Sequence, residues 1–239
     1  MAHINLMNPT IPLGSVILVT GANGLIASWP ISILMKGAAL RPRHGPGRFE
    51  LVEMSDFGTP GAWDMPVRGV AGIAAVAGSA NLDLLDIDGA LKVEFPFVSE
   101  LLRAAKDEPN VKSVIFTSSA WAAWTPDPSR KGALHEWPYN DDAVRLVLRA
   151  EKPSYTFNTI LPETIFGATQ SPEHQGIQST CGMVKWLREG WFIDTQDLAA
   201  LYVKALTTPG VNGERLFAFG NKYSFSKVAQ LLRKLEPEE

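Results

Sequence analysis

The chain has 239 residues and a formal net charge of -3 at pH 7, which suits one α/β domain and provides no basic field for a nucleic-acid backbone. Its single cysteine, Cys181, excludes an internal disulfide and a multi-cysteine metal site, and it predicts a reducing, cytoplasmic location. The four histidines lack the spacing of a helical zinc site, and no stretch approaches the roughly 18 apolar residues of a membrane span, so we expect no metal, nucleic acid or membrane as partner.

The first half of the chain predicts buried strands that alternate with helices. Ser15–Thr20 is a short, β-branched apolar run of the kind that forms a buried parallel strand. A helix is expected over Leu25–Lys36, and Pro30 inside it should bend or break it. Two more strands and a helix are expected over Phe49–Met54, Val70–Ala77 and Val93–Lys106.

The second half continues the alternation. Val114–Thr117 predicts another buried strand, and residues 120–140, rich in tryptophan, proline and charge, predict a long surface loop. A helix over Thr195–Leu206 would be capped by Asp194 or Thr195. The other expected elements are helices over 141–150, 180–188 and 226–235 and strands over 155–161 and 216–219. This pattern is typical of one α/β domain with a doubly wound parallel sheet.

A glycine turn joins the first expected strand to the first expected helix, with the pattern G-x-x-G-x-x-A. Gly21 permits the tight turn, Gly24 lets the backbone approach a pyrophosphate, and Ala27 lets the helix lie against the sheet. The positive end of the helix would face the anion. The pattern favours dinucleotide binding over a plain structural turn, and the residues that would bind are Gly21, Asn23, Gly24, Leu25, Ile26 and Ala27.

Together with later segments, this turn resembles the extended short-chain dehydrogenase/reductases of the NAD-dependent epimerase/dehydratase family, and within them the dihydroflavonol reductase and aldehyde reductase-like members. The segments that match, in the family's order, are VTGANGLIAS, GPGRFELVEMSDF, VKSVIFTSSAWAAWTP, EKPSYTFNTILPETIFG, FIDTQDLAALYVKAL and VNGERLFAFG. The resemblance implies a Rossmann-like sheet over residues 1–239, to which residues 163–239 add a reduced substrate lobe. It also implies a small-molecule substrate and NADP(H) in preference to NAD(H).

The resemblance assigns cofactor contacts at the ends of the later strands. Asp56 and Phe57 would border the adenine. Ala77 and Gly78 would line the passage toward the nicotinamide, and Pro162 would lie beside that ring.

Ser119, the last residue of the TSS run, would hydrogen-bond a substrate carbonyl; by itself it equally fits a hydroxyl that closes a strand end.

After the first helix only residues 38–48 stand where the doubly wound fold needs a strand, a helix and turns, so the second strand is expected to be reduced or absent. Arg41 and Arg43 lie there. They fit either a contact with a cofactor 2′-phosphate or a solvated basic loop.

The chain departs from the family at its catalytic helix. Reductases of the family place Tyr-x-x-x-Lys on a helix after the TSS strand, because residues four apart share a helix face and the lysine lowers the tyrosine pKa. Neither Tyr139 nor Tyr155 has a lysine four residues later. The literal match from Tyr223 to Lys227 falls in the C-terminal lobe and is interpreted as coincidence, and Glu100 replaces an asparagine common in the family, which weakens a proton relay.

Three functions remain open. The first is an NADPH-dependent reductase of aldehydes or ketones, acting on a small apolar molecule through Ser119 and a non-standard proton donor. The second is a non-redox isomerase, cyclase or lyase of secondary metabolism, in which Trp121, Trp124 and Trp137 either shape a pocket or only anchor a loop. The third is a pseudoenzyme or partner subunit with a vestigial cofactor site, in which a homodimer covers the surface that the lost strand leaves bare. We take the reductase as the first choice.

Overall fold

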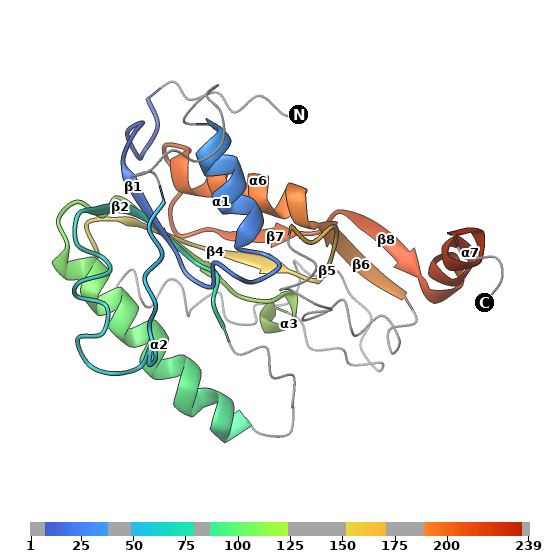
Figure 1. Cartoon of the computed structure of the whole chain (residues 1–239), viewed down its shortest axis with the longest axis horizontal. Helices are drawn as coiled ribbons and strands as arrows, with labels where there is room; N and C mark the ends of the chain where they lie inside the picture. The colour runs from blue at the N-terminus through green and yellow to red at the C-terminus, as the bar shows by residue number, and fades with distance from the viewer. Residues whose placement is uncertain (1–7, 38–48, 79–86, 124–151, 171–188, 236–239) are drawn as a thin grey trace.

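The computed structural model of the chain describes residues 8–37, 49–78, 87–123, 152–170 and 189–235 (Figure 1). The described main sheet is parallel, in the order β1-β2-β3-β4-β7, and its strands are β1 (Val16–Val19), β2 (Val70–Ala75), β3 (Ser113–Thr117), β4 (Thr156–Pro162) and β7 (Arg215–Ala218). In a second sheet, β6 (Glu189–Asp194) lies between a parallel β5 (Thr164–Phe166) and an antiparallel β8 (Asn221–Ser224). The described helices are α1 (Ser28–Gly37), α2 (Ile87–Asp107), α3 (Ala120–Ala123), α6 (Thr195–Thr207) and α7 (Phe225–Leu235).

Helices cover both faces of the main sheet. Figure 1 shows α1 and α6 side by side on one face and α2 on the opposite face. Val114 and Ile115 are neighbours in β3 and both are fully buried, but Val114 packs with α2 and Ile115 with α6. Successive side chains of a strand point to opposite faces, so a strand buried on both faces has a continuous apolar sequence. The doubly wound α/β sheet predicted from the sequence is confirmed.

The strand predicted over Phe49–Met54 is wrong. This segment has no strand pairing, and its apolar side chains at Phe49, Leu51 and Val52 are 51%, 72% and 51% exposed. The segment pairs neither with β2, which is paired on both sides, nor with the outer edge of β1, which has no partner strand in the described sheet. A strand propensity produces a strand only where a neighbour is present. In the described sheet β1 is consequently an edge strand, where the doubly wound order would continue to further strands.

Helix α1 starts later than predicted, and this changes the role of its proline. The helix begins at Ser28, not at Leu25, so Pro30 lies in the first turn. The first four N–H groups of a helix have no partner inside it, so a proline there removes no helical hydrogen bond. The predicted bend at Pro30 is therefore wrong.

The cap of α6 is the one predicted. The Asp194 carboxylate accepts a hydrogen bond from the Gln196 amide at 2.7 Å, and the helix begins at Thr195. The expected helices over 141–150 and 180–188 lie outside the described residues. The three strands of the second sheet were not predicted.

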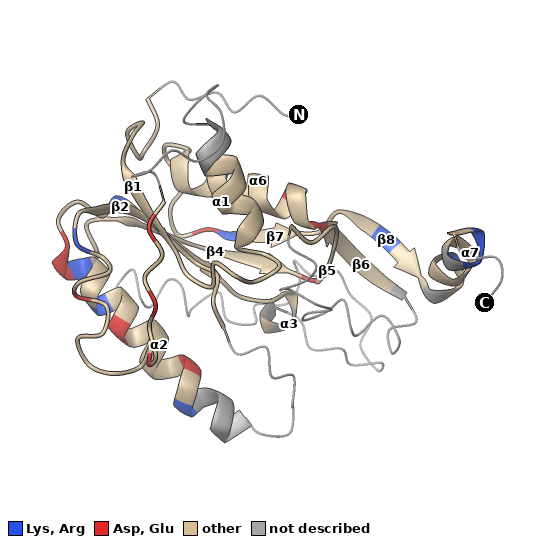
Figure 2. Cartoon of the chain, viewed as in Figure 1, with Lys and Arg blue, Asp and Glu red and all other residues tan. Residues whose placement is uncertain are grey.

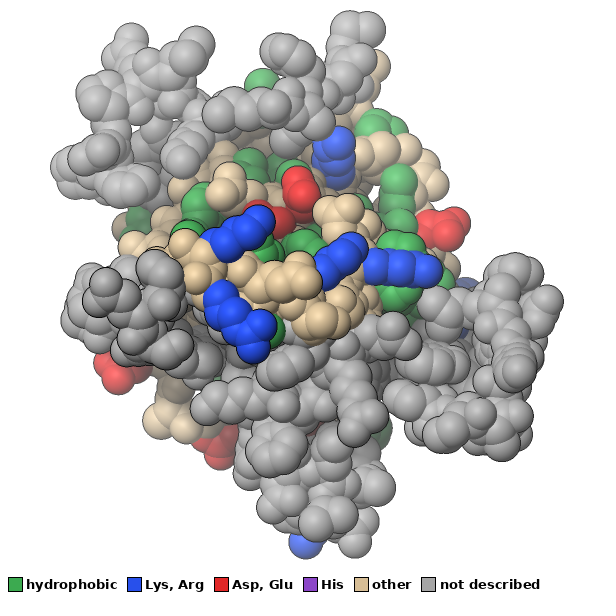
Figure 3. Space-filling model, turned by 90° about the vertical axis from the view of Figure 1, so that its right-hand side faces the viewer, with side chains coloured by type: hydrophobic (Ala, Val, Ile, Leu, Met, Phe, Trp, Pro, Cys, Tyr) green, Lys and Arg blue, Asp and Glu red, His purple; other side chains and the backbone are tan. Residues whose placement is uncertain are grey.

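The C-terminal part contributes to both sheets. Helix α6 packs on the main sheet and β7 belongs to it, whereas β5, β6 and β8 form the second sheet. Helix α7 contacts β8 and extends away from the main sheet (Figure 1). Lys and Arg side chains gather on this end of the molecule (Figure 3), whereas α2 carries both signs of charge (Figure 2). The division into a main domain and a substrate lobe from residue 163 stays a prediction.

No helix in the described ranges combines the length and the apolar content of a bilayer span.

Trp63 provides a test of the core between the main sheet and α2. Its side chain is 1% exposed and packs between the rings of Phe57 and Phe97, at 5.8 and 5.5 Å. Replacing Trp63 by Ala should lower the free energy of unfolding by about 3–5 kcal/mol, because it leaves a cavity. Met65→Ala is the control, since Met65 is 72% exposed and its loss should change stability by less than about 0.5 kcal/mol. Urea denaturation measures both, and equal losses would contradict the core position of Trp63.

Candidate functional site

The glycine turn follows the carboxyl end of β1. Gly21 has a φ of 70°, and a Cβ atom on it would lie 3.1 Å from the Cα of Ala77. The Gly24 amide donates to the Gly21 carbonyl at 2.8 Å, and Ala27, just before α1, is fully buried. Both the left-handed conformation and the close backbone require glycine at position 21. The tight turn at Gly21 and the burial of Ala27 therefore agree with the pattern, and the cofactor contacts it implies stay a prediction.

Thr20 links the ends of β1 and β2. Its amide donates to the Ala74 carbonyl at 3.1 Å, and its hydroxyl accepts from the amides of Val76 and Ala77 at 2.9 and 2.8 Å. Thr20 is 5% exposed, so these hydrogen bonds are shielded from water. They hold the segment that leads to Gly78 beside the glycine turn. The sequence analysis missed this threonine, although its place directly before Gly21 was a usable signal.

Ser119 and Pro162 lie at the same edge as the glycine turn. The Ser118 amide donates to the Ile160 carbonyl at 2.8 Å, in continuation of the parallel pairing of Thr117 with Ile160. Ser119 is exposed and directly precedes α3, and Pro162 is the buried last residue of β4. The structure thus brings together the ends of the strands on which the sequence placed its substrate-side candidates.

Thr117, which directly precedes Ser118 and Ser119, is held by hydrogen bonds to β2 and α6. The Thr117 hydroxyl donates to the Ala75 carbonyl at 2.7 Å, so the Tyr202 hydroxyl, 2.5 Å away, donates to Thr117. Tyr202 is fully buried, and this burial raises its pKa. The phenol stays neutral, and its hydrogen bond fixes the end of β3.

Asp56 and Phe57 belong to a loop beside α2. The Asp56 carboxylate accepts from the Gly58 amide at 2.8 Å and from the Thr59 hydroxyl at 2.7 Å. The Thr59 hydroxyl and the Gly58 amide hold the pKa of Asp56 below its ordinary value. The Phe57 ring packs against Trp63 and is 39% exposed, which leaves part of it open to contact.

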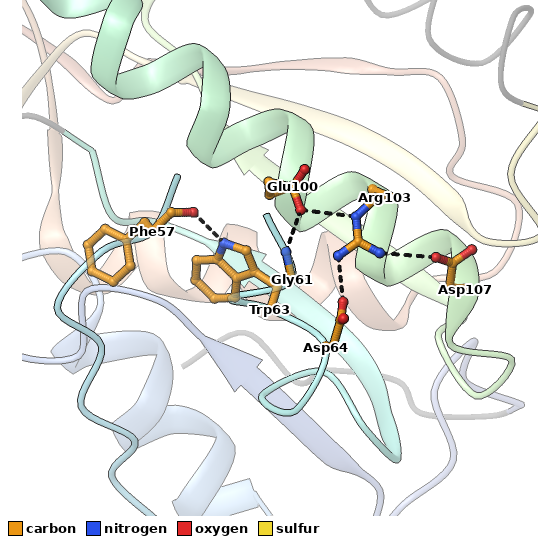
Figure 4. Close-up of polar contacts among 7 residues, drawn as sticks. All are labelled: Phe57, Gly61, Trp63, Asp64, Glu100, Arg103 and Asp107. Atoms are coloured by element: carbon orange, nitrogen blue, oxygen red, sulfur yellow. Dashed lines mark hydrogen bonds and ion pairs between the residues drawn. The ribbon is translucent and has the colours of Figure 1, made fainter. Parts of the chain in front are cut away.

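Glu100 holds this same loop in place (Figure 4). Its carboxylate accepts from the Gly61 amide and from Arg103, both at 3.0 Å, and these two donors lower the pKa of Glu100. Arg103 also pairs with Asp64 and Asp107, so one guanidinium joins the loop to α2. Glu100 therefore binds the loop and Arg103. It does so at the position where members of the family commonly have an asparagine that supports a proton relay.

The literal Tyr-x-x-x-Lys match does not lie on one helix. Tyr223 is in β8, and α7 begins two residues later. The Lys227 amide donates to the Ser224 hydroxyl at 3.4 Å, so Ser224 caps the helix. The tyrosine and the lysine cannot form the helical pair of the family.

One carboxyl group at the site edge was not predicted. Glu163 directly follows Pro162, and its Oε2 atom accepts from the Trp191 amide at 2.9 Å. Glu163 is half-buried, and this burial raises its pKa. The signal was an acidic residue immediately after the proline that ends a strand at the site.

Several predicted site residues cannot be placed. Arg41, Arg43, Tyr139 and all four histidines lie outside the described residues, as do Trp124, Trp137 and the side chain of Trp121. In the part that is described, no three His, Cys, Asp or Glu side chains are arranged to hold a metal ion.

This arrangement, a parallel doubly wound sheet with a glycine turn after its first strand, defines a Rossmann-like nucleotide-binding architecture. No protein-family model matches the chain. It is 32% identical to the ketoreductase adrE of Penicillium rubens over 281 residues, covering 96% of this chain and 83% of the relative. It is 26% identical to aldehyde reductase 2 of Sporidiobolus salmonicolor, covering 100% of this chain and 86% of the relative.

A solved structure gives the same fold. The yeast methylglyoxal/isovaleraldehyde reductase Gre2, complexed with NADPH, superposes with a TM-score of 0.75 at 17% identity, over 93% of this chain and 83% of that one. The chain belongs to the extended short-chain dehydrogenase/reductase superfamily, and the resemblance found in the sequence is confirmed.

The Thr20 link gives a direct test of how the edge is held. Thr20→Val should remove the acceptor of two buried amides and lower the free energy of unfolding by about 1–3 kcal/mol for each amide. Thr20→Ser keeps the hydroxyl and should lose clearly less. Chemical denaturation of the wild type and the two variants measures the free energy of unfolding. Equal losses in the two variants would show that the hydroxyl does not contribute to stability.

Proposed function

We propose that the chain is an NADPH-dependent reductase of aldehydes or ketones that acts on a small apolar molecule without the family's tyrosine as proton donor. The observation that carries the proposal is the glycine turn. A Cβ atom at Gly21 would crowd the backbone of Ala77, and one at Gly24 would lie 3.1 Å from the Gly21 carbonyl oxygen. The turn thus has no side chain at Gly21 or Gly24, so a ligand could approach its backbone closely, and it leads into helix α1.

The residues present fit the cofactor. The pyrophosphate would be held by the turn formed by Gly21, Asn23, Gly24, Leu25, Ile26 and Ala27, which leads into the amino end of α1. Asp56 and Phe57 would border the adenine. The arginines at 41 and 43 supply the charge that a 2′-phosphate requires, which favours NADP(H) over NAD(H).

The substrate side is formed by the ends of β2, β3 and β4. Ala77 and Gly78 would line the passage toward the nicotinamide, and Pro162 would lie beside its ring. Ser119 would donate a hydrogen bond to the substrate carbonyl. NADPH, when bound, supplies the hydride for the carbonyl carbon, and the oxygen then needs a proton from the protein.

The relatives support a reductase in two ways. Those named above are called ketoreductase and aldehyde reductase, and the solved structure named above is complexed with NADPH. The alignment with the Penicillium rubens protein spans 281 positions, more than the 239 residues of this chain, so that protein has residues without a counterpart here. This supports a shortened member of the family and agrees with the missing tyrosine helix.

Cofactor binding is tested at Gly21. Gly21→Ala should weaken NADPH binding by about tenfold or more, since about 1.4 kcal/mol of lost contact already has that effect. Gly210→Ala is the matched control, because Gly210 has a similar φ of 80° but open space around its Cα, and it should bind as the wild type does. Fluorescence titration with NADPH measures both.

The outcomes separate the functions. If the wild type binds neither NADPH nor NADH, the proposal is overturned. If it binds NADPH but oxidises it with no aldehyde or ketone of a broad panel, a non-redox enzyme or a pseudoenzyme is favoured.

A further inference from the structure

The reductase proposed above lacks the family's tyrosine, so another group must donate the proton to the substrate oxygen. The positions of the four tyrosines bear on which group this is. Tyr155 directly precedes β4, at the end opposite to the site, and Tyr202 is buried beneath the sheet as the donor to Thr117. Tyr139 lies outside the described residues. Tyr223 remains, and it lies next to the unpredicted carboxyl group of Glu163.

Glu163 lies at the edge where the substrate carbonyl would be held. Thr117 pairs with Ile160, and the Ser118 amide donates to the Ile160 carbonyl, so the chain after β3 runs beside the end of β4. Ser119 and Glu163 each follow the end of one of these neighbouring strands, and α3 contacts β4. The carboxyl group therefore belongs to the same rim as the proposed carbonyl-binding serine.

Gly190 packs closely against both Glu163 and Tyr223. A Cβ atom at this position would lie 3.4 Å from Oε1 of Glu163 and 3.3 Å from the Tyr223 hydroxyl. Oε2 of Glu163 is held by the Trp191 amide, so the other oxygen lies on the side of the glycine. The backbone thus fixes one carboxyl oxygen at Trp191, and the absence of a side chain at Gly190 lets the other lie close to the chain and to the Tyr223 hydroxyl.

An aromatic wall adjoins the carboxyl group. Phe166 packs against Phe192 and Tyr223, with ring centroids 5.4 Å apart in both pairs. Since residues two apart in a strand share a face, Thr164 lies on the face of Phe166, and Gly190 on that of Phe192. The rings of Phe166, Phe192 and Tyr223 thus form one aromatic cluster, and Gly190 packs beside Oε1 of Glu163.

The surroundings of Glu163 shift its pKa in the direction that a proton donor needs. Burial raises its pKa, although the amides of Thr164 and Trp191 donate to it. The described titratable group that faces it is Tyr223, whose own pKa is raised by burial and by the negative charge of Glu163. Lys222 lies over the Trp191 ring at 5.0 Å, and strand alternation places it on the face opposite to Tyr223.

We propose that Glu163 is the proton donor of this enzyme, in the place that the tyrosine has in the family. The inference rests on the proposed function. As the carbonyl carbon gains a hydride, the electron pair of the C=O π bond moves to oxygen, and this oxygen takes the proton of the Glu163 carboxyl. The alcohol leaves, and water returns a proton to the carboxylate.

Glu163→Gln tests the inference by pH profile. In the wild type, kcat/KM for aldehyde reduction should fall as the pH rises through the pKa of Glu163, because only the protonated carboxyl donates. The glutamine variant should lose about 10²–10⁴-fold in kcat and the pH dependence with it. Its affinity for NADPH should equal that of the wild type, and Glu214→Gln, which removes an exposed carboxylate, should behave as the wild type. Glu163→Asp should restore part of the rate and the pH dependence.

A second measurement needs no cofactor. In protein with ¹³C-labelled glutamate carboxyl groups, one resonance should titrate above the ordinary glutamate range and be absent from Glu163→Gln. Unchanged kcat and pH profile in Glu163→Gln, or their loss in Tyr139→Phe instead, would overturn the inference and leave the reductase intact. A wild type that reduces no carbonyl compound would overturn the proposed function itself.

Discussion

The structure depends on the parallel pairing of β1, β2, β3 and β4. Because these strands run in the same direction, all their carboxyl ends meet at one edge of the sheet. The glycine turn, the segment after β2, the serine pair and the proline of β4 come from sequence positions between 21 and 162. The register of the sheet is what makes them neighbours.

Buried polar links stiffen this edge. The Thr20 hydroxyl binds two amides after β2, and the Thr117 hydroxyl joins the carbonyl of Ala75 to the phenol of Tyr202. A buried group left without its partner costs more than an ordinary hydrogen bond contributes, so each link favours one arrangement of the strand ends. The two threonines thus make this edge rigid.

The sequence predicted the elements whose signal is local. Val70–Ala77 and Val114–Thr117 are continuous apolar runs and form buried strands, and Asp194 is a cap because its side chain reaches the next turn. Phe49–Met54 failed because strand formation needs a partner that only the tertiary structure supplies. The second sheet was missed because β5 and β8 have only three and four residues, which is too short for a clear alternation in the sequence.

The candidate site divides in the same way. The glycine spacing is a local pattern and located the turn, whereas the surroundings of Glu163 are formed by Trp191 and Tyr223, which come from other strands. A pKa raised by burial is a property of packing, and neighbouring residues in the sequence do not reveal it.

The most direct measurement of cofactor binding is a crystal structure with NADPH: the account predicts the pyrophosphate on the backbone of the glycine turn and the nicotinamide beside Pro162. Cofactor bound elsewhere, or a turn filled by the protein's own side chains, would contradict it.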